Sequence, residues 1–246
     1  NNEANFYGRR SIFPNLGFDT FTSAEYMEKE EDKNPLGWTK DEVLTDEIIK
    51  CLDSTEGPDY VYTISTQGHG AYPEEQLIDD PEITVTGSAT EAQNNQWEYY
   101  CNEIHEMDNF VKELTDALAD YPEDVILVMY GDHLPTMGLT VEDLKNKYLF
   151  QTEYVIWDNM GLTKKDENLA SYQIAAEVLD RVGIHEGTIM KYHQARGNTK
   201  NYQVDLETLQ YDVLYGKRYA YGGENPFERT KMRMGLYDVT LDSIRL

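Results

Sequence analysis

The sequence has few cysteines, few positive charges and no long apolar run. Only two of the 246 residues are cysteine, and Cys51 and Cys101 lack CxxC spacing, which favours free thiols over a disulfide. Lys and Arg number 21 against 46 Asp and Glu, a formal net charge of -25. This field repels phosphate backbones and anionic membrane surfaces, which argues against nucleic acid as a partner.

A membrane-spanning helix needs ~20 consecutive apolar residues, and no window of the sequence provides them. Residues 1–10 also lack the pattern of a signal peptide, so we expect the segment to be soluble as given. The sequence contains no GxSxG, P-loop or GxGxxG motif. Its 40% hydrophobic content is sufficient for a packed core, in one large domain or two small ones.

Short apolar runs rich in β-formers alternate with helical patterns. Residues 59–66, 124–130 and 152–159 predict strands, the first two covered on both faces. Between the first two strands, apolar residues recur at spacings of three and four and predict a helix that ends at YPED: Ile104, Met107, Val111, Leu114 and Leu118. The alternation predicts an α/β fold, an α/β/α sandwich with a mainly parallel sheet.

Capping patterns mark three further segments. Thr39 and Glu42 have the spacing of a capping box ahead of a short apolar helix, and Thr140 and Asp143 have N-cap and N3 spacing. Residues 169–183 predict a helix that ends at a glycine.

The end of the chain has weaker periodicity than the rest. From about residue 186 the sequence is rich in Tyr and Arg, which predicts a small C-terminal subdomain or an antiparallel extension of the sheet. We therefore divide the chain into residues 1–185, which hold the strands and the candidate site, and residues 186–246.

Two histidine-bearing turns follow the first two predicted strands. His69 lies between two glycines after residues 59–66, and Asp132 and His133 follow a glycine after residues 124–130. Ligands gather at the carboxyl ends of parallel strands. Carboxylate oxygen and imidazole nitrogen are ligands for Mn or Zn, which makes Asp132 and His133 a candidate metal site. The alternative is an Asp that caps a turn beside a hydrogen-bonded histidine.

The role of His69 is open between a third metal ligand, a general acid, a donor to an anionic substrate, and a loop histidine without function. Near the N-terminus, Arg9 and Arg10 stand out in an acidic protein beside Tyr7. A guanidinium makes paired hydrogen bonds to phosphate or sulfate, although a solvated basic pair explains the same residues.

His105 and Asp108 have i, i+3 spacing that could suit a metal. The apolar stripe of their helix already explains this stretch, and the HExxH pattern is absent. We therefore favour a structural role for both. His185 and His193 lie in no distinctive pattern.

Four stretches together resemble the lipoteichoic acid synthase type of phosphoglycerol transferase, within the sulfatase and alkaline phosphatase superfamily. They are NFYGRRSIFPNLGFDTFTSAEYM, YTISTQGHGAYP, WEYYCNEIHEMDNFVKEL and VMYGDHLP, in that order. The resemblance covers most of the first 160 residues. It implies an alkaline phosphatase-like α/β/α fold and a divalent metal, usually Mn with Mg or Zn as alternatives, held in part by Asp132 and His133. It also implies that His69 and Arg9 contact the phosphoglycerol group, with Tyr7 where relatives often carry Trp.

Members of this family move phosphoglycerol from an anionic lipid donor to a polymer or glycan of the cell envelope, outside the cell. Their nucleophilic Thr and a further acidic metal ligand lie upstream of the stretch that matches NFYGRR. We therefore expect a fragment with little turnover, whose parent reaches the membrane through helices upstream, and which associates with itself through an exposed sheet edge. A sulfatase or phosphodiesterase of the same superfamily, or a non-catalytic binding module, are the alternatives.

Overall fold

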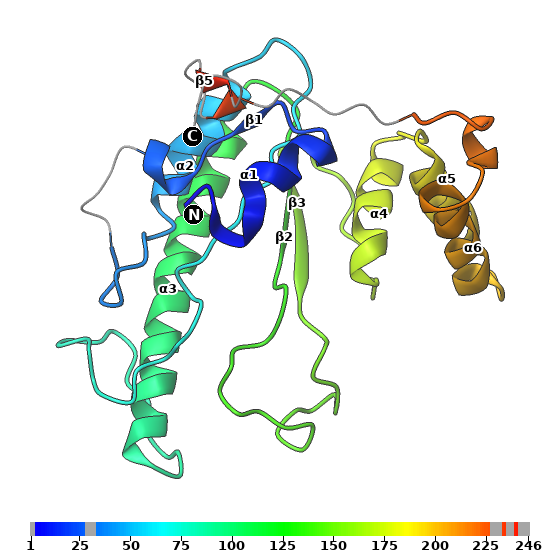
Figure 1. Ribbon diagram of the computed structural model, residues 1–246. Coiled ribbons are helices and arrows are strands. Elements are labelled where there is room, and N and C mark those ends of the chain that lie inside the picture. Colours follow the sequence, from blue (N-terminus) through cyan, green and yellow to red (C-terminus); the bar gives the residue numbers. More distant parts are fainter. Residues whose placement is uncertain (1–2, 28–32, 227–232, 235–238, 241–246) are drawn as a thin grey trace. The chain divides into compact units, whose positions relative to one another are not determined.

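The computed structural model describes residues 3–27, 33–226, 233–234 and 239–240 (Figure 1). Contacts divide the chain into two compact units, residues 1–159 with 229–246, and residues 160–228, and each is described by itself. The boundary after residue 185 was drawn from sequence pattern and stays a prediction. The last parts of the predicted C-terminal region, residues 227–232, 235–238 and 241–246, lie outside the described residues.

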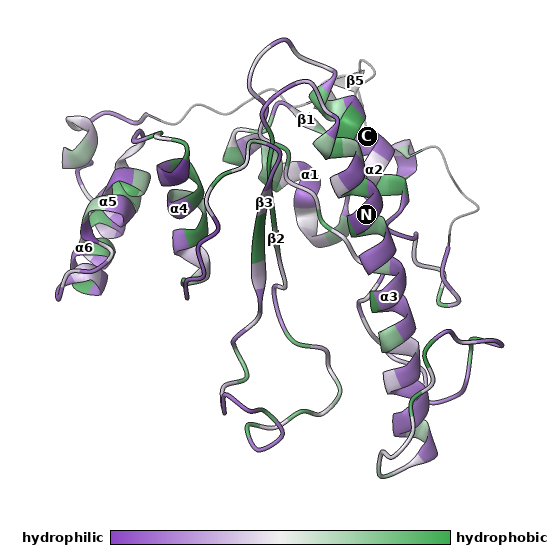
Figure 2. Ribbon diagram, turned by 180° about the vertical axis from the view of Figure 1, so that it is seen from behind, coloured by the Kyte–Doolittle hydropathy of each residue, from purple (hydrophilic) through white to green (hydrophobic). Residues whose placement is uncertain are grey.

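The longest element of the first unit is helix α3 (Glu91–Ala119). It begins where the side chain of Thr90 accepts a hydrogen bond from the backbone N–H of Gln93, which satisfies one of the free donors at the helix start. It ends before the YPED sequence, as predicted. The expected apolar stripe is present on this helix. Toward its N-terminus the helix is more hydrophilic (Figure 2).

The hydrophobic core of the first unit lies between α3 and α2 (Val43–Leu52). Leu114 and Leu118 are each 2% exposed, and they pack with residues of α2 and with the partly buried face of β2 (Ile126–Tyr130) and β3 (Tyr154–Asp158). Helix α2 begins at Val43, and the capping box at Thr39 and Glu42 stays a prediction. Thr39 pairs with Lys33 in an isolated β-bridge, and Glu42, the residue before the helix, makes no side-chain capping hydrogen bond.

Strands and helices coexist in the first unit, but the strand pairing differs from the prediction of a mainly parallel sheet. In the described part of the chain, β1 (Thr20–Phe21) pairs parallel with β4 (Arg233–Met234), whereas β4 with β5 (Val239–Thr240) and β2 with β3 are antiparallel. A parallel pair needs a crossover, usually helical. Residues 131–153 between β2 and β3 form turns instead, so an antiparallel pair forms.

Thr140 and Asp143, which have N-cap and N3 spacing, are joined by hydrogen bonds. The backbone N–H and hydroxyl of Thr140 both donate to the Asp143 carboxylate, and turns follow. The spacing therefore marks a local turn here and not the start of a helix.

The predicted strand at residues 59–66 is also absent as a strand. Within the described residues no ladder includes this segment, and Tyr60 is 77% exposed. A strand depends on hydrogen bonds to a neighbour, so β-rich composition alone did not suffice.

Asn159 ties the end of α3 to the hairpin of β2 and β3. Its Oδ1 accepts from the backbone N–H of Val125 at 2.8 Å, and its Nδ2 donates to the carbonyls of Leu118 at 3.2 Å and Glu123 at 2.9 Å. One amide thus satisfies three backbone groups of a connecting loop. The tie fixes the base of the hairpin from which the Asp132-His133 turn extends.

The second unit contains the helices α4 (Ile174–Arg181), α5 (Thr188–Arg196) and α6 (Tyr202–Leu214). Helix α4 ends as predicted, and Gly183 follows it with φ 72°. Tyr202 is buried beside His193, whose Nδ1 lies 2.7 Å from the Tyr202 hydroxyl. The predicted C-terminal region is therefore helical here, while β4 and β5 pair in the first unit.

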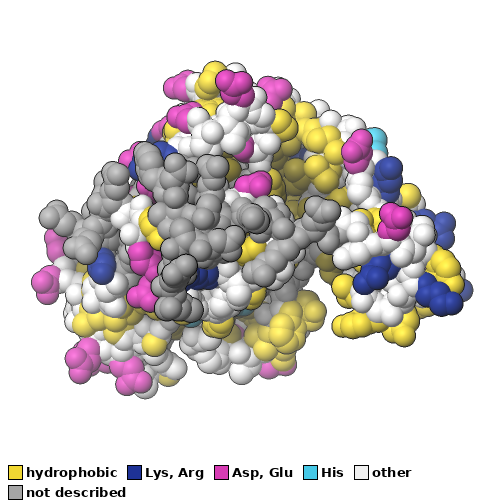
Figure 3. All heavy atoms as spheres, turned by 45° about the horizontal axis from the view of Figure 1, so that its top comes forward, with side chains coloured by type: hydrophobic (Ala, Val, Ile, Leu, Met, Phe, Trp, Pro, Cys, Tyr) yellow, Lys and Arg dark blue, Asp and Glu magenta, His cyan; other side chains and the backbone are white. Residues whose placement is uncertain are grey.

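Acidic side chains are scattered over the face shown in Figure 3, as the net charge of -25 requires. Among the helices of the described residues, none combines the length and the apolar character that a membrane crossing requires.

Candidate metal and phosphate site

The two histidine turns of the first unit lie against each other. The ring centroids of His69 and His133 are 5.7 Å apart and the rings meet edge to face, at 84°. His133 follows β2, and His69 follows the extended segment that was predicted as the neighbouring strand. The proximity expected from their positions after two apolar runs is therefore present, although residues 59–66 form no strand.

Both rings are oriented by the carbonyl of the following residue. Nδ1 of His69 lies 2.6 Å from the oxygen of Gly70, and Nδ1 of His133 lies 2.9 Å from the oxygen of Leu134. A carbonyl oxygen only accepts hydrogen bonds, so each Nδ1 carries the hydrogen. Each Nε2 then keeps its lone pair for a metal ion or a proton.

Asp132 and His133 form the candidate pair of metal ligands. Asp132 Oδ1 lies 3.7 Å from His133 Nε2, and both side chains are more than half exposed. These donor types suit a divalent metal, but a zinc-type site takes four ligands. In the part of the chain that the structure describes, no group of three or more His, Cys, Asp or Glu side chains gathers to hold a metal. The pair fits part of a metal site and does not complete one.

Arg9 is the first residue of the short helix α1 (Arg9–Ile12). Its guanidinium lies 5.3 Å from the ring centroid of Phe6, a cation–π contact. Burial lowers the pKa of Arg9, and the neighbouring Tyr62 and Tyr7 act in the opposite direction. Arg9 remains a cation at any physiological pH, with its planar group free of a close carboxylate partner in the described ion pairs.

Tyr7 lies at the surface of the N-terminal turn, beside Phe6. It is 82% exposed, it stacks edge to face on Phe6 with centroids 4.5 Å apart, and its φ of 52° lies in the left-handed region. A non-glycine residue at this φ is uncommon.

Two tyrosines interact between the two apolar runs. The interaction with Tyr62, together with burial, raises the pKa of Tyr130 to about 12, and the charges of Tyr60 and Asp132 add to the shift. The sequence gave no reason to single out either residue. Their position in the two apolar runs that precede the histidine turns, Tyr62 within the first and Tyr130 at the end of the second, is the signal that could have found them.

A cavity of about 410 Å³ opens beside these residues. Phe18 and Tyr60 stack at 5.9 Å on one side of it. Of the predicted site residues, Arg9 lines this cavity, whereas His69, Asp132 and His133 do not. Tyr62 lines the cavity together with Arg9, and Tyr130 precedes Asp132 by two residues.

The remaining histidines have local partners. His105 Nε2 lies 2.9 Å from Glu82, and His185 lies 3.4 Å from Asp180. His105 thus faces a loop carboxylate and does not pair with Asp108, in agreement with the structural role expected for it.

The sequence profile of the Sulfatase family matches residues 1–184. The chain belongs to the sulfatase family. The predicted membership of the sulfatase and alkaline phosphatase superfamily is thereby confirmed.

Two known proteins are similar over most of this chain. A putative cyclic beta-1,2-glucan modification protein of Rhizobium meliloti (strain 1021) is 28% identical over 257 residues, which cover 87% of this chain and 40% of that protein. The structure of the Streptococcus pyogenes phosphoglycerol transferase GacH in complex with sn-glycerol-1-phosphate matches with a TM-score of 0.77 and 23% identity, over 93% of this chain and 63% of that chain.

The match to GacH shows the fold, and with the family it confirms the predicted alkaline phosphatase and sulfatase type of α/β fold. This sulfatase-family chain spans less than two thirds of the length of either relative.

Proposed function

We propose that this chain is part of an enzyme that transfers phosphoglycerol to a glycan or polymer of the cell envelope, with a divalent metal at Asp132 and His133. The observation that carries the proposal is the pair of imidazoles whose rings meet 5.7 Å apart, each with Nδ1 directed at a main-chain carbonyl. Similarity to a phosphoglycerol transferase and to a glucan modification protein supports this choice of substrates.

The chemistry of a phosphate ester fits the charges of the described residues. The non-bridging oxygens of phosphate need positive charge or hydrogen-bond donors around them, in a protein that is otherwise strongly acidic. His69, when protonated at Nε2, and Arg9 supply such donors, and Tyr7 is proposed to border the glycerol group. A bound metal would act as a Lewis acid on a phosphoryl oxygen.

Mn is the proposed metal, as the resemblance to the phosphoglycerol transferases implies. Mg and Zn are the alternatives, because carboxylate oxygen suits Mg and Mn and imidazole nitrogen suits Zn. Further ligands and a nucleophile are required, and Asp132 with His133 supplies two donors. The lipid donor, the extracellular location of the parent and self-association through a sheet edge belong to the same proposal. Low turnover by the chain alone is an expected outcome.

Calorimetric titration of the 246-residue chain with Mn²⁺ and with sn-glycerol-1-phosphate tests the proposal. We expect Asp132→Ala to abolish the Mn²⁺ heat and Arg9→Gln to weaken glycerol phosphate binding about 10-fold or more, the cost of one charge-assisted hydrogen bond. Asp108→Ala and His105→Ala are matched controls, because they change the same residue types on the exposed side of α3, and they should leave both titrations unchanged.

Tighter binding of a sulfate monoester than of glycerol phosphate would favour the sulfatase alternative. Absence of binding for both esters and for the metal would leave a non-catalytic module as the better description, and would contradict the proposal.

A further inference from the structure

The turn that carries His69 rests on a buried side chain, Gln67, which is 2% exposed. Its Oε1 accepts from the backbone N–H of Asp41 at 2.9 Å, and its Nε2 donates to Oε2 of Glu106 on α3. The backbone carbonyl of Gln67 accepts from Nδ2 of Asn34 at 3.5 Å. Gln67 therefore connects the turn to a loop on one side and to α3 on the other.

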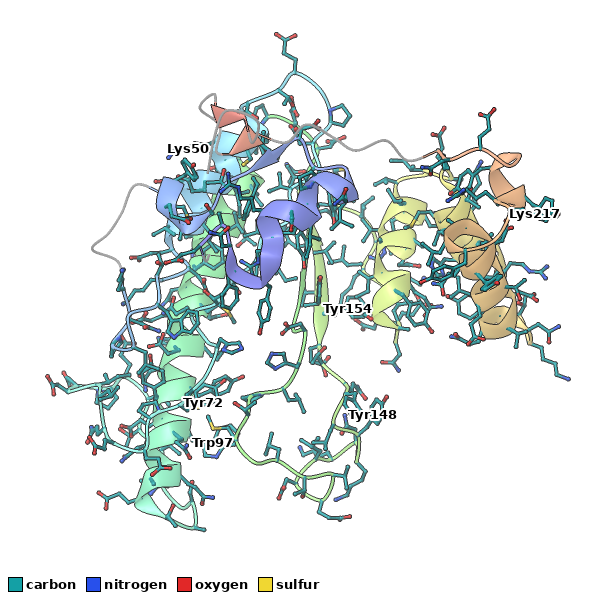
Figure 4. All side chains as sticks on the ribbon, viewed as in Figure 1. Lys50, Tyr72, Trp97, Tyr148, Tyr154 and Lys217 are labelled. Carbon is teal, nitrogen blue, oxygen red and sulfur yellow. The ribbon has the colours of Figure 1, made fainter. Side chains whose placement is uncertain are left out.

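The residues around Gln67 hold the same turn at other points. Asp41 Oδ1 accepts from the backbone N–H of Thr66 at 3.2 Å. The backbone N–H of His69 donates to the Thr66 carbonyl at 3.0 Å, which closes the turn. The hydroxyl of Tyr72, which lies along α3 in Figure 4, donates to the Gly68 carbonyl at 3.0 Å. The backbone on both sides of His69 is thus hydrogen-bonded.

The two glycines of this turn pack closely against neighbouring side chains, Gly68 against α3 and Gly70 against Tyr72. A Cβ added to Gly68 would lie 3.0 Å from Cδ1 of Ile104, and one added to Gly70 would lie 2.8 Å from the ring of Tyr72. Contacts this short force a neighbour to move. The two glycines that flank His69 are therefore explained by packing of the turn.

Asn34 extends this arrangement to the ring of His69 itself. Its Nδ2 donates to Oε2 of Glu103 at 3.0 Å, and its Oδ1 accepts from the backbone N–H of Trp38 at 2.9 Å. The ring of Trp38 lies 6.0 Å from that of His69. The loop that contains Asn34 and Trp38 thereby contacts both Gln67 and the imidazole of His69.

The primary amide at position 67 serves two partners at once. Its carbonyl oxygen accepts from a backbone N–H and its NH2 group donates to a carboxylate, and neither group carries a charge. A carboxylate at position 67 would lie against Glu106 in a buried site that already holds Glu103, 2% exposed. Two like charges at this separation repel strongly.

We infer that Gln67 is a positioning residue, which holds the turn so that His69 keeps its Nδ1 hydrogen on the Gly70 carbonyl and its Nε2 toward the ligand. The link to a phosphate ligand rests on the proposed function above. The link to the tautomer of His69 does not, because it concerns the chain without a ligand.

The test uses the full 246-residue chain labelled with ¹⁵N-histidine. The chain has five histidines, so His69→Ala identifies the His69 signals. In the wild-type chain, at a pH where the ring is neutral, we expect the Nδ1–H form. Gln67→Met, which keeps the length without charge, and Gln67→Glu should lose this preference and should weaken sn-glycerol-1-phosphate binding about 10-fold, as expected when an anchored donor becomes misplaced.

The exchange variant Gln67→Glu with Glu106→Gln is the decisive comparison. It preserves an acceptor for the Asp41 N–H, a donor between positions 67 and 106, and an oxygen for Lys40, whose Nζ lies 2.9 Å from Glu106. We expect it to restore both the tautomer and the affinity. Leu114→Ala, which destabilises the core, controls for a general loss of stability and should change neither.

An unchanged tautomer in Gln67→Met, or failure of the exchange variant to restore it, would overturn the inference even if the wild-type chain binds glycerol phosphate. If the wild-type chain binds no glycerol phosphate, the proposed function fails at this site, and the tautomer measurement still decides the role of Gln67.

Discussion

Substitution of Asn159 by Ala should destabilise the first unit by about 3 kcal/mol. Its amide makes three hydrogen bonds, to the backbone of Val125, Leu118 and Glu123, and each contributes about 1 kcal/mol net, with a range of about 0.5 to 1.5. For a unit of this size, about 1 kcal/mol corresponds to about 2–4 °C in Tm. The expected decrease is therefore about 6–12 °C.

Tryptophan fluorescence in urea is a suitable assay, because Trp38, Trp97 and Trp157 all belong to the first unit and report on it selectively. Asn109→Ala changes the same residue type at an exposed position of α3 and should stay within about 0.5 kcal/mol of wild type. A loss of less than about 1 kcal/mol for Asn159→Ala, on the scale of a single hydrogen bond, would refute the reasoning that this side chain satisfies three backbone groups.

Three further outcomes follow from buried groups. Burial raises the pKa of Glu103 above its ordinary value of 4.5, so its contribution to stability is full below about pH 4.5 and is lost as pH rises through the folded-state pKa. In thermal melts, the stability of Glu103→Gln relative to wild type should therefore increase from pH 4.5 to pH 7. An equal stability difference at both pH values would contradict this. Burial lowers the pKa of His193 below 6.5, so its contribution to stability is present above pH 6.5 and is lost as pH falls through the folded-state pKa. The protection factors of the α5 amides against hydrogen exchange should therefore fall over that window in wild type, and if His193→Gln shows the same fall, the histidine is not the cause. Leu114→Ala removes a 2% exposed core side chain and should cost about 2–5 kcal/mol in urea unfolding, whereas a smaller cost would show that the core collapses into the space.

The helices were predictable from sequence where their pattern is local. The stripe on α3 and the glycine after α4 depend on residues within a few turns of each other, and both predictions were confirmed. Residues 59–66 failed as a strand because a ladder requires a neighbour that local composition does not specify.

The candidate site was predictable in part. The meeting of His69 and His133 was expected from their positions after two apolar runs. Tyr62, Tyr130 and Gln67 were not found, because their roles depend on contacts between segments that are distant in sequence. Individual residue types carry little information about such contacts before the chain is folded.

Both imidazoles are oriented by main-chain oxygens, those of Gly70 and Leu134. A main-chain acceptor is encoded by no particular side chain, so position 134 is free to vary without loss of the ring orientation at His133. Position 70 is restricted for a different reason, the ring of Tyr72. Substitutions should therefore be tolerated at position 134, after His133, and not at position 70, after His69. A saturation library at these two positions would show this difference directly.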